Sequence, residues 1–230
     1  MEAGSYDLSV SNEELLRRCQ EQDQEALQVL FRRHERPVYG LLLRMIGSRE
    51  DAEEALADVF VKVWRSANKF RGESKFTTWL YRISANTARD ALRARHGQHD
   101  VSLEDMAEWD SEAVTASTDT AGDPSESLLR SENKAVLMAA LQRVSDDDRL
   151  LITLYHLQEL SYDEMSQILN APAANLKVRL FRARQRLRQQ FEALSEESPG
   201  ADVQKEGQNH ALRTDTTEST GIQPPAVELP

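Results

Sequence analysis

The sequence has little of several features that define whole classes of protein. Its single cysteine, Cys19, excludes an internal disulfide framework and a zinc site built on thiolates, and we expect a semi-buried helical residue. With 9 glycines in 230 residues and almost no alternating apolar runs, the composition argues against a β-sheet protein. No stretch approaches the roughly 18 apolar residues of a membrane span, and no basic segment leads into an apolar one at the start. These absences predict a helical, cytoplasmic protein.

Basic charge is scarce overall and concentrated in a few places. The chain has 28 Lys and Arg residues against 39 Asp and Glu residues, a formal net charge of -11 at pH 7. Between Gly97 and Leu129 it has no Lys or Arg, and acidic residues stand among Ser, Thr and Ala. This composition predicts a flexible acidic linker. An acidic protein should also bind bare DNA poorly, so any role on DNA implies a larger assembly that does most of the holding.

Capping signals and helical periodicity predict an all-α chain of two small helical domains. The predicted parts are, in order, a domain at residues 11–96, the linker at 97–129, a domain at 130–194 and a disordered tail at 195–230. In the first domain, Ser11 and Ser48 each begin a helix and Gly47 ends one. Pro37 is expected to kink or divide the long helix in which it lies. We expect the linker to let the free domains close on each other and hide their basic faces.

The segment from Ser161 to Arg188 has the pattern of a helix-turn-helix. Ser161 and Glu164 form a capping box for the first helix, which breaks at Asn170. A longer helix follows, whose apolar residues recur at helical spacing as a buried seam: Leu176, Leu180, Ala183, Leu187, Phe191 and Leu194. Its other faces carry Lys177, Arg179, Arg182, Arg184, Arg186 and Arg188. Phosphates are the natural partner of such a surface.

A basic helix is more often an ordinary solvated surface, and the pattern alone leaves the two interpretations near even. The composition separates them. Because the chain as a whole is acidic, basic charge confined to one helix is a local exception and favours binding to an anion.

A second basic segment combines cations with aromatic rings. The aromatic residues Phe70, Phe76, Trp79 and Tyr81 stand beside Lys69, Arg71, Lys75 and Arg82. Rings that stack on unpaired bases beside cations that hold the backbone are typical of single-strand binding. The spacing of Phe76, Trp79 and Leu80 is more typical of core residues, so the connecting loop is the better candidate. Gly72 allows close approach there, and Asn68, Lys69, Arg71, Glu73 and Ser74 can read the edge of a flipped-out base.

Two segments together resemble a known family. They are DAEEALADVFVKVWRSANKFRGESKFTTWLYRISANTARDALRAR and SYDEMSQILNAPAANLKVRLFRARQRLR, and they are similar to the two conserved regions of bacterial extracytoplasmic-function (ECF) sigma factors, from about Gln24 to Gln190. The resemblance implies a two-domain helical subunit that binds core RNA polymerase. The first domain would dock on the clamp helices of the largest polymerase subunit and open the minus-ten element, and the second would read the minus-thirty-five element. An anti-sigma factor is a possible further partner, and no cofactor or metal is implied.

The resemblance also assigns roles to residues. Polymerase docking would fall to Asp51, Glu54, Asp58, Val61, Lys62, Trp64 and Arg65. Capture of a melted base would fall to the loop with Asn68, Lys69, Phe70, Arg71, Gly72, Glu73 and Ser74. Arg82, Asn86, Arg89 and Arg93, on one face of the following helix, would line the promoter. The recognition helix would present Ala173, Ala174, Asn175, Lys177, Val178, Arg179, Phe181 and Arg182.

The chain departs from the family pattern in the recognition helix. Ala174 and Asn175 stand where the family usually has a Gly-Thr pair, and Val178 replaces a small polar residue. Asn175 is able to cap the helix, but a valine cannot hydrogen-bond a base edge. These departures put the sequence read at the minus-thirty-five element in doubt.

Two other classes of function are open to the sequence. An autonomous helix-turn-helix regulator would explain the second domain but leaves the first without a role. An enzyme has little support, because the histidines are scattered and only His96, His99 and Asp100 resemble a metal cluster. That cluster is better explained as a solvated surface, and the sequence therefore predicts a protein that is not an enzyme.

Overall fold

The structure, a computed structural model, describes residues 10–96 and 124–197, and within these ranges all regular structure is helical. The elements are α1 (Asn12–Gln20), α2 (Gln24–Ile46), α3 (Arg49–Ser66), the short 3-10 helix η1 (Ala67–Lys69), α4 (Phe76–His96), α5 (Pro124–Arg143), α6 (Asp146–His156), α7 (Tyr162–Leu169) and α8 (Ala173–Glu197). The prediction of an all-α fold is confirmed. None of the helices described combines the length and apolarity needed to cross a membrane.

In the first unit, α1 to α4, side-chain caps and a left-handed glycine set several of the helix ends. The Ser11 hydroxyl accepts from the Glu14 amide at 3.2 Å, and the Ser48 hydroxyl accepts from the Asp51 amide at 3.3 Å. Each bond satisfies an amide that the first helical turn leaves without a partner. Gly47 ends α2 in the left-handed region, with φ at 83°. These three predicted boundaries are confirmed, whereas Pro37 lies inside α2 and does not divide it.

The second unit, α5 to α8, contains the predicted helix-turn-helix in α7 and α8. The reciprocal capping box of Ser161 and Glu164 is present, and Asn170 ends α7 in the left-handed region with φ at 49°. The expected capping role of Asn175 is wrong. Because α8 already begins at Ala173, the carbonyl of Pro172 takes the first intrahelical bonds, and it accepts from the Asn175 amide at 2.9 Å.

The edges of the second unit also differ from the sequence prediction. α5 begins at Pro124, inside the range predicted as linker, because proline is favoured at the first position of a helix and the acidic composition hides that signal. α8 continues to Glu197, slightly into the predicted tail. The rest of the linker (97–123) and of the tail (198–230) lies outside the described residues.

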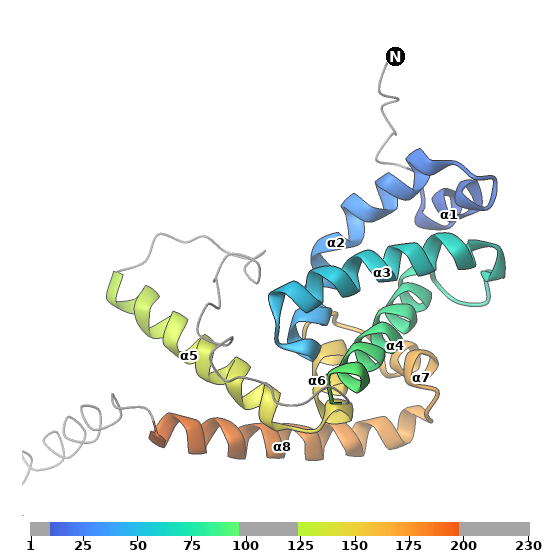
Figure 1. The fold of residues 1–230 in the computed structure, drawn as a ribbon. Coiled ribbons are helices and arrows are strands. Elements are labelled where there is room, and N and C mark those ends of the chain that lie inside the picture. Colours follow the sequence, from blue (N-terminus) through green and yellow to red (C-terminus); the bar gives the residue numbers. More distant parts are fainter. Residues whose placement is uncertain (1–9, 97–123, 198–230) are drawn as a thin grey trace, which may run out of the picture.

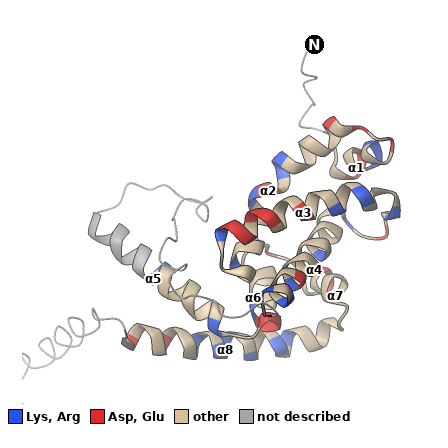
Figure 2. Cartoon of the chain, in the orientation of Figure 1, with Lys and Arg blue, Asp and Glu red and all other residues tan. Residues whose placement is uncertain are grey.

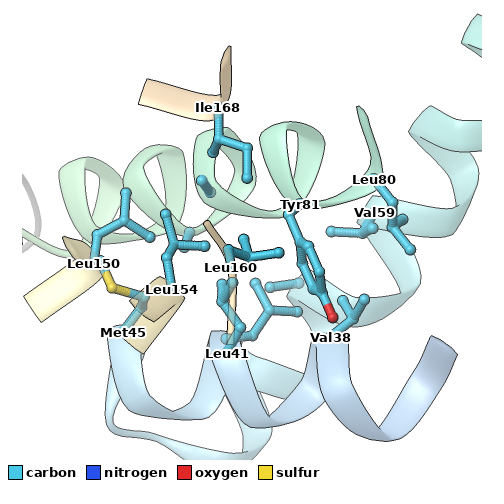
Figure 3. Packing of buried hydrophobic residues seen from close by; sticks show 14 of the residues in the cluster. Val38, Leu41, Met45, Val59, Leu80, Tyr81, Leu150, Leu154, Leu160 and Ile168 are labelled. Carbon is cyan, nitrogen blue, oxygen red and sulfur yellow. The ribbon is translucent and has the colours of Figure 1, made fainter. Parts of the chain in front are cut away.

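The two units are packed against each other over one continuous hydrophobic core. Leu41 and Met45 of α2 and Tyr81 of α4 lie beside Leu150 and Leu154 of the second unit, all within one buried cluster (Figure 3). In the ribbon, α7 packs along α4, and α6 packs against α2 and α8 (Figure 1). The expectation that the free domains close on each other is confirmed.

Buried polar groups join the units as well. The guanidinium of Arg149, 5% exposed, donates to the carbonyl of Met45 at 2.6 Å, and Gln142 donates to the carbonyl of Arg44 at 2.7 Å. Gln158 accepts from the hydroxyl of Tyr81 and donates to the carbonyl of Pro37 at 3.0 Å. Burial raises the pKa of Tyr81 to about 12, so this hydroxyl stays a donor.

Candidate nucleic-acid interface

The loop before α4 is fixed at both of its ends by the core of the first unit. Phe76, at the start of α4, is fully buried, and its backbone amide donates to the carboxylate of Glu13 in α1 at 3.0 Å. A side chain from α1 thus caps α4. Since η1 anchors the other end through the buried Ala67, the residues between them are presented outward from a rigid base.

The aromatic residues of this region divide into core and surface. Phe76 is core, as its spacing predicts, and Trp79 is 7% exposed. Phe70 is half-buried and meets Trp79 edge to face, with ring centroids 5.4 Å apart. The two rings form one wall of a cavity, so the aromatic pair supports the loop from beneath.

The cavity brings most of the predicted base-capture residues together. Its volume is about 640 Å³, and its lining comprises Asn68, Lys69, Phe70, Arg71, Glu73, Ser74, Thr78, Trp79, Arg82 and Gln167. Gly72 is not part of the lining. It sits at the exposed loop with φ at 74° and has open space where a Cβ would lie, so the loop needs its backbone freedom and no neighbour crowds it.

The sequence does not point to two members of this lining, Thr78 and Gln167, and it favours a core position for Trp79. Thr78 and Trp79 belong to the buried side of α4, and only the small exposed part of each side chain lines the cavity. Gln167 comes from α7 in the second unit, so no local pattern around residue 70 can indicate it. Only the closure of the two units places it there.

The predicted promoter-lining face of α4 is largely open to solvent. Arg82, Asn86 and Arg93 are exposed. Arg89 differs, because its side chain is 28% exposed and donates to Asp147 of α6 at 3.3 Å. The expectation that closure hides the basic faces is therefore wrong for three of these four residues, since α7 covers a neighbouring strip of α4 instead.

The first half of α8 presents its basic residues outward. Leu176, Leu180 and Ala183 are fully buried, which confirms the inner part of the predicted seam. Lys177, Arg179 and Arg182 are exposed, as are Ala174 and Asn175, while Ala173 is half-buried. Two apolar side chains are exposed among them, Val178 at 51% and Phe181 at 60%. Cations and apolar side chains are therefore both accessible on this half of the helix.

The arginines in the second half of α8 are engaged within the protein instead. The Nε of Arg184 donates to His156 Nε2 at 2.9 Å, and its guanidinium lies 4.8 Å from the centroid of the Tyr155 ring. Arg186 pairs with Asp148 at 2.5 Å, and Arg188 pairs with Glu192 at 2.8 Å. Arg184 and Arg186 are thus held by α6, Arg179 lies 3.8 Å from Asp147 of α6, and Arg188 pairs along its own helix, distinctions that the sequence alone does not make.

The predicted polymerase-docking face lies along α3. Glu54, Asp58 and Arg65 are exposed, and Val61 exposes 44% of its surface. Lys62 is half-buried and turns toward α4, where its ammonium donates to the Thr87 hydroxyl at 2.9 Å. Asp51 and Trp64 are also half-buried, and Asp51 lies 3.8 Å from Arg95. Figure 2 shows acidic residues gathered on α3 and basic residues spread along α8.

Other candidate sites carry little chemistry. No group of three or more His, Cys, Asp and Glu side chains in the described ranges could hold a metal ion. His99 and Asp100 of the possible cluster lie outside those ranges, as does the side chain of His96. Cys19 is buried, and burial with the nearby charge of Asp23 raises the pKa of its thiol to about 11, which suits a core residue.

Two family models match the chain. The model described as Sigma-70 region 2 matches residues 30–97. The model described as Sigma-70, region 4 matches residues 134–187. The first match ends with α4, and the second runs from within α5 through most of α8.

Several curated proteins are similar over most of the chain. The ECF RNA polymerase sigma-E factor of Haemophilus influenzae is 34% identical over 188 residues, which are 80% of this chain and 97% of that protein. The ECF RNA polymerase sigma-E factor of Escherichia coli K12 is 31% identical over 176 residues, 76% of this chain and 92% of that protein. The RNA polymerase sigma-H factor of Pseudomonas aeruginosa is 29% identical over 190 residues, 81% and 97% of the two chains.

Two solved structures share the fold. The structure of CnrH in complex with the cytosolic domain of CnrY matches with a TM-score of 0.57 and 20% identity, over 79% of this chain and 97% of that one. The sigma factor RpoE from Bartonella quintana, in complex with the anti-sigma factor NepR, matches with a TM-score of 0.51 and 23% identity, over 74% and 95%.

Proposed function

The chain belongs to the ECF sigma factors of the sigma-70 family, and from that membership we propose a division of labour between its two helical units. The protein binds core RNA polymerase and directs it to promoters for transcription initiation. The first unit docks on polymerase and captures the melted minus-ten element, and the second unit reads the minus-thirty-five element. We place this activity in the cytoplasm, with an anti-sigma factor as a further partner.

The cavity before α4 is the observation that carries the first half of the proposal. Its volume of about 640 Å³ lies within the usual range for small-molecule and cofactor sites, enough for a flipped-out base. Phe70 and Trp79 offer ring surface, while Asn68 and Arg71 offer donors for a base edge or the backbone. Since Arg82 joins the lining from α4, the captured strand can continue along the exposed Asn86 and Arg93.

The first half of α8 supports the second half of the proposal. A recognition helix reads bases with residues near its N-terminus, and here these are exposed and basic. Arg182 and Lys177 can donate to guanine, and apolar side chains contact the methyl group of thymine. The exposed Val178 therefore gives one departure from the family pattern a role, namely a preference for thymine at the position that it faces, and the exposed Phe181 can make the same kind of contact.

The face of α3 supports polymerase docking through its charge and its exposed large apolar residue, Val61. We expect Glu54→Lys to slow association with core polymerase and weaken binding, more strongly at low salt, because exposed charges act over about a Debye length. Glu25→Lys makes the same charge change at an exposed position of α2 and serves as the control. Equal affinities of the two variants for core polymerase would mean that the α3 face is an ordinary solvated surface and does not bind polymerase.

An autonomous helix-turn-helix regulator is the rival interpretation. It would account for α7 and α8 but not for the region 2 match over residues 30–97 or for the cavity within it. Promoter-specific binding by the protein without polymerase would favour this rival.

Run-off transcription with purified core polymerase over a genomic fragment library tests the proposal. We expect discrete transcripts whose start sites share an upstream and a downstream element, and none with core polymerase alone. Arg71→Ala should lose transcripts while the protein still binds core polymerase. Arg17→Ala, at an exposed arginine of α1 that pairs with Glu14 and Glu21, is the matched control and should leave the transcripts unchanged. Absence of any sigma-dependent transcript would overturn the proposal.

A further inference from the structure

One carboxylate on α6 touches basic residues from both of the DNA-facing surfaces. Asp147 lies in the first turn of α6, with Oδ1 at 3.3 Å from Arg89 of α4 and Oδ2 at 3.8 Å from Arg179 of α8. The two arginines come from units that the proposed function places on separate promoter elements. In the closed protein they share a single anion.

We propose that Asp147 is an internal substitute for a DNA phosphate, which occupies Arg89 and Arg179 in the closed protein and lowers its affinity for DNA until polymerase separates the units. The proposal rests on the proposed function, because it needs both arginines to be DNA contacts. A carboxylate offers a guanidinium the same kind of oxygen acceptors and negative charge as a phosphate, so the two compete for one donor.

The same closure also places α7 beside the base-capture cavity. Glu164 of α7 accepts from Lys75, beside the loop, at 2.8 Å, and Gln167 of α7 lines the cavity itself. The closed arrangement thus reaches both sites, with a charge at Arg89 and Arg179 and a helix beside the cavity.

The forces that close the units are separate from the ion pairs of Asp147. The side chain of Asp147 is 63% exposed, and ion pairs in such a setting contribute little to stability. The shared core around Leu41, Tyr81 and Leu154, with the buried bonds of Arg149, supplies the attraction between the units. Removing the charge of Asp147 should therefore free the two arginines without opening the protein.

A matched pair of variants in the full-length protein tests this. Asp147→Asn is compared with Asp163→Asn, because both residues are exposed and each is the second residue of its helix. Asp163 makes no ion pair with a described residue. The probe is a fluorescein-labelled DNA duplex of random sequence, titrated without polymerase and followed by anisotropy at two salt concentrations.

We expect Asp147→Asn to tighten binding about three- to tenfold and to steepen the salt dependence by about one to two phosphate contacts. Asp163→Asn should change affinity less than about twofold. In the background of Arg89→Gln, the gain from Asp147→Asn should shrink. Equal gains for the two aspartate variants, or a gain that persists unchanged without Arg89, would overturn the proposal.

A cross-linking measurement tests the closure of the units independently of transcription. Lys75→Cys combined with Glu164→Cys allows a short bismaleimide to join the units when they are closed. We expect efficient cross-linking of the free protein, equal cross-linking with Asp147→Asn, and a loss of cross-linking on binding core polymerase. No cross-link in the free protein overturns the further inference even if transcription succeeds. If transcription fails but Asp147→Asn still binds DNA more tightly than Asp163→Asn, only the proposed function is overturned.

Discussion

The two halves of α8 carry similar basic residues and use them differently. Lys177 and Arg182, in the first half, are exposed, whereas Arg184 and Arg186, in the second half, bind His156 and Asp148 of α6. Arg149 of α6 is the arginine most fully engaged within the protein, because it is buried and donates only to backbone carbonyls and the nearby Asp146. What decides the role of an arginine is the element packed beside it rather than the helix that bears it.

Replacing the buried Arg149 should have the largest effect, and that effect should be on stability. Arg149 donates to the carbonyls of Leu141, Gln142, Val144 and Met45. Arg149→Met leaves several of these buried acceptors without a donor, so we expect the free energy of unfolding to fall by about 2 to 4 kcal/mol. Urea unfolding followed by circular dichroism measures it. Arg188→Met, at an exposed arginine of the same unit, is the control, and a loss below about 1 kcal/mol for Arg149→Met would contradict the role assigned to Arg149.

Replacing the exposed Arg182 should weaken DNA binding without changing the stability of the protein. Arg182→Ala is expected to weaken recognition of the upstream element by about 1 to 3 kcal/mol, while Arg188→Ala does much less because it lies farther along the helix and meets at most phosphates. Binding of holoenzyme to cognate and scrambled upstream elements measures the difference. If both variants lose equal affinity on both sequences, Arg182 does not read bases.

An intermediate case lies at Arg186, which pairs with the nearly buried Asp148 while its own side chain is 55% exposed. We expect Arg186→Ala to lower the free energy of unfolding by about 1 kcal/mol and Arg188→Ala to lower it less. The same urea measurement checks both variants. A larger loss for Arg188→Ala than for Arg186→Ala would contradict the role assigned to the ion pair of Arg186 with Asp148.

The smallest expected effect depends on pH and concerns Arg184. Partial burial, and then the charge of Arg184, lower the pKa of His156 from its ordinary 6.5. The unfolded chain therefore binds more protons than the folded one once the pH falls below about 6.5, and stability is lost as the pH decreases through that range. We expect His156→Gln, which keeps an acceptor for Arg184, to flatten the dependence of the melting temperature between pH 7 and pH 5. An unchanged slope would assign the dependence to other groups.

Local signals in the sequence predict the helix boundaries well. Ser11, Ser48 and Ser161 each accept from the amide three residues later, and Gly47 adopts the left-handed conformation that few other residues tolerate. Such interactions span a few residues, so a sequence pattern contains all of their parts. Asn175 is an exception, because Pro172, three residues earlier, supplies a competing start to α8.

Interactions between distant elements could not be predicted in the same way. Glu13 caps α4 from another helix, Gln167 joins the base-capture cavity across the closed units, and Asp147 reaches arginines of two helices. Each depends on where a helix packs, which is set by many small apolar contacts together. The sequence therefore predicts which residues carry the chemistry of the site, but not which of them are already engaged.

The capping of α2 by the second unit has a consequence for the order in which the protein is made. The carbonyls of Arg44 and Met45 at the end of α2 bind Gln142 and Arg149, which follow them by 98 and 104 residues. A ribosome adding roughly 5 to 20 residues per second needs on the order of 5 to 20 seconds for that distance. During this time the nascent first unit lacks the partners that complete the end of α2 and cover its face toward α6. A chaperone or core polymerase that meets the growing chain in this interval meets the first unit uncovered.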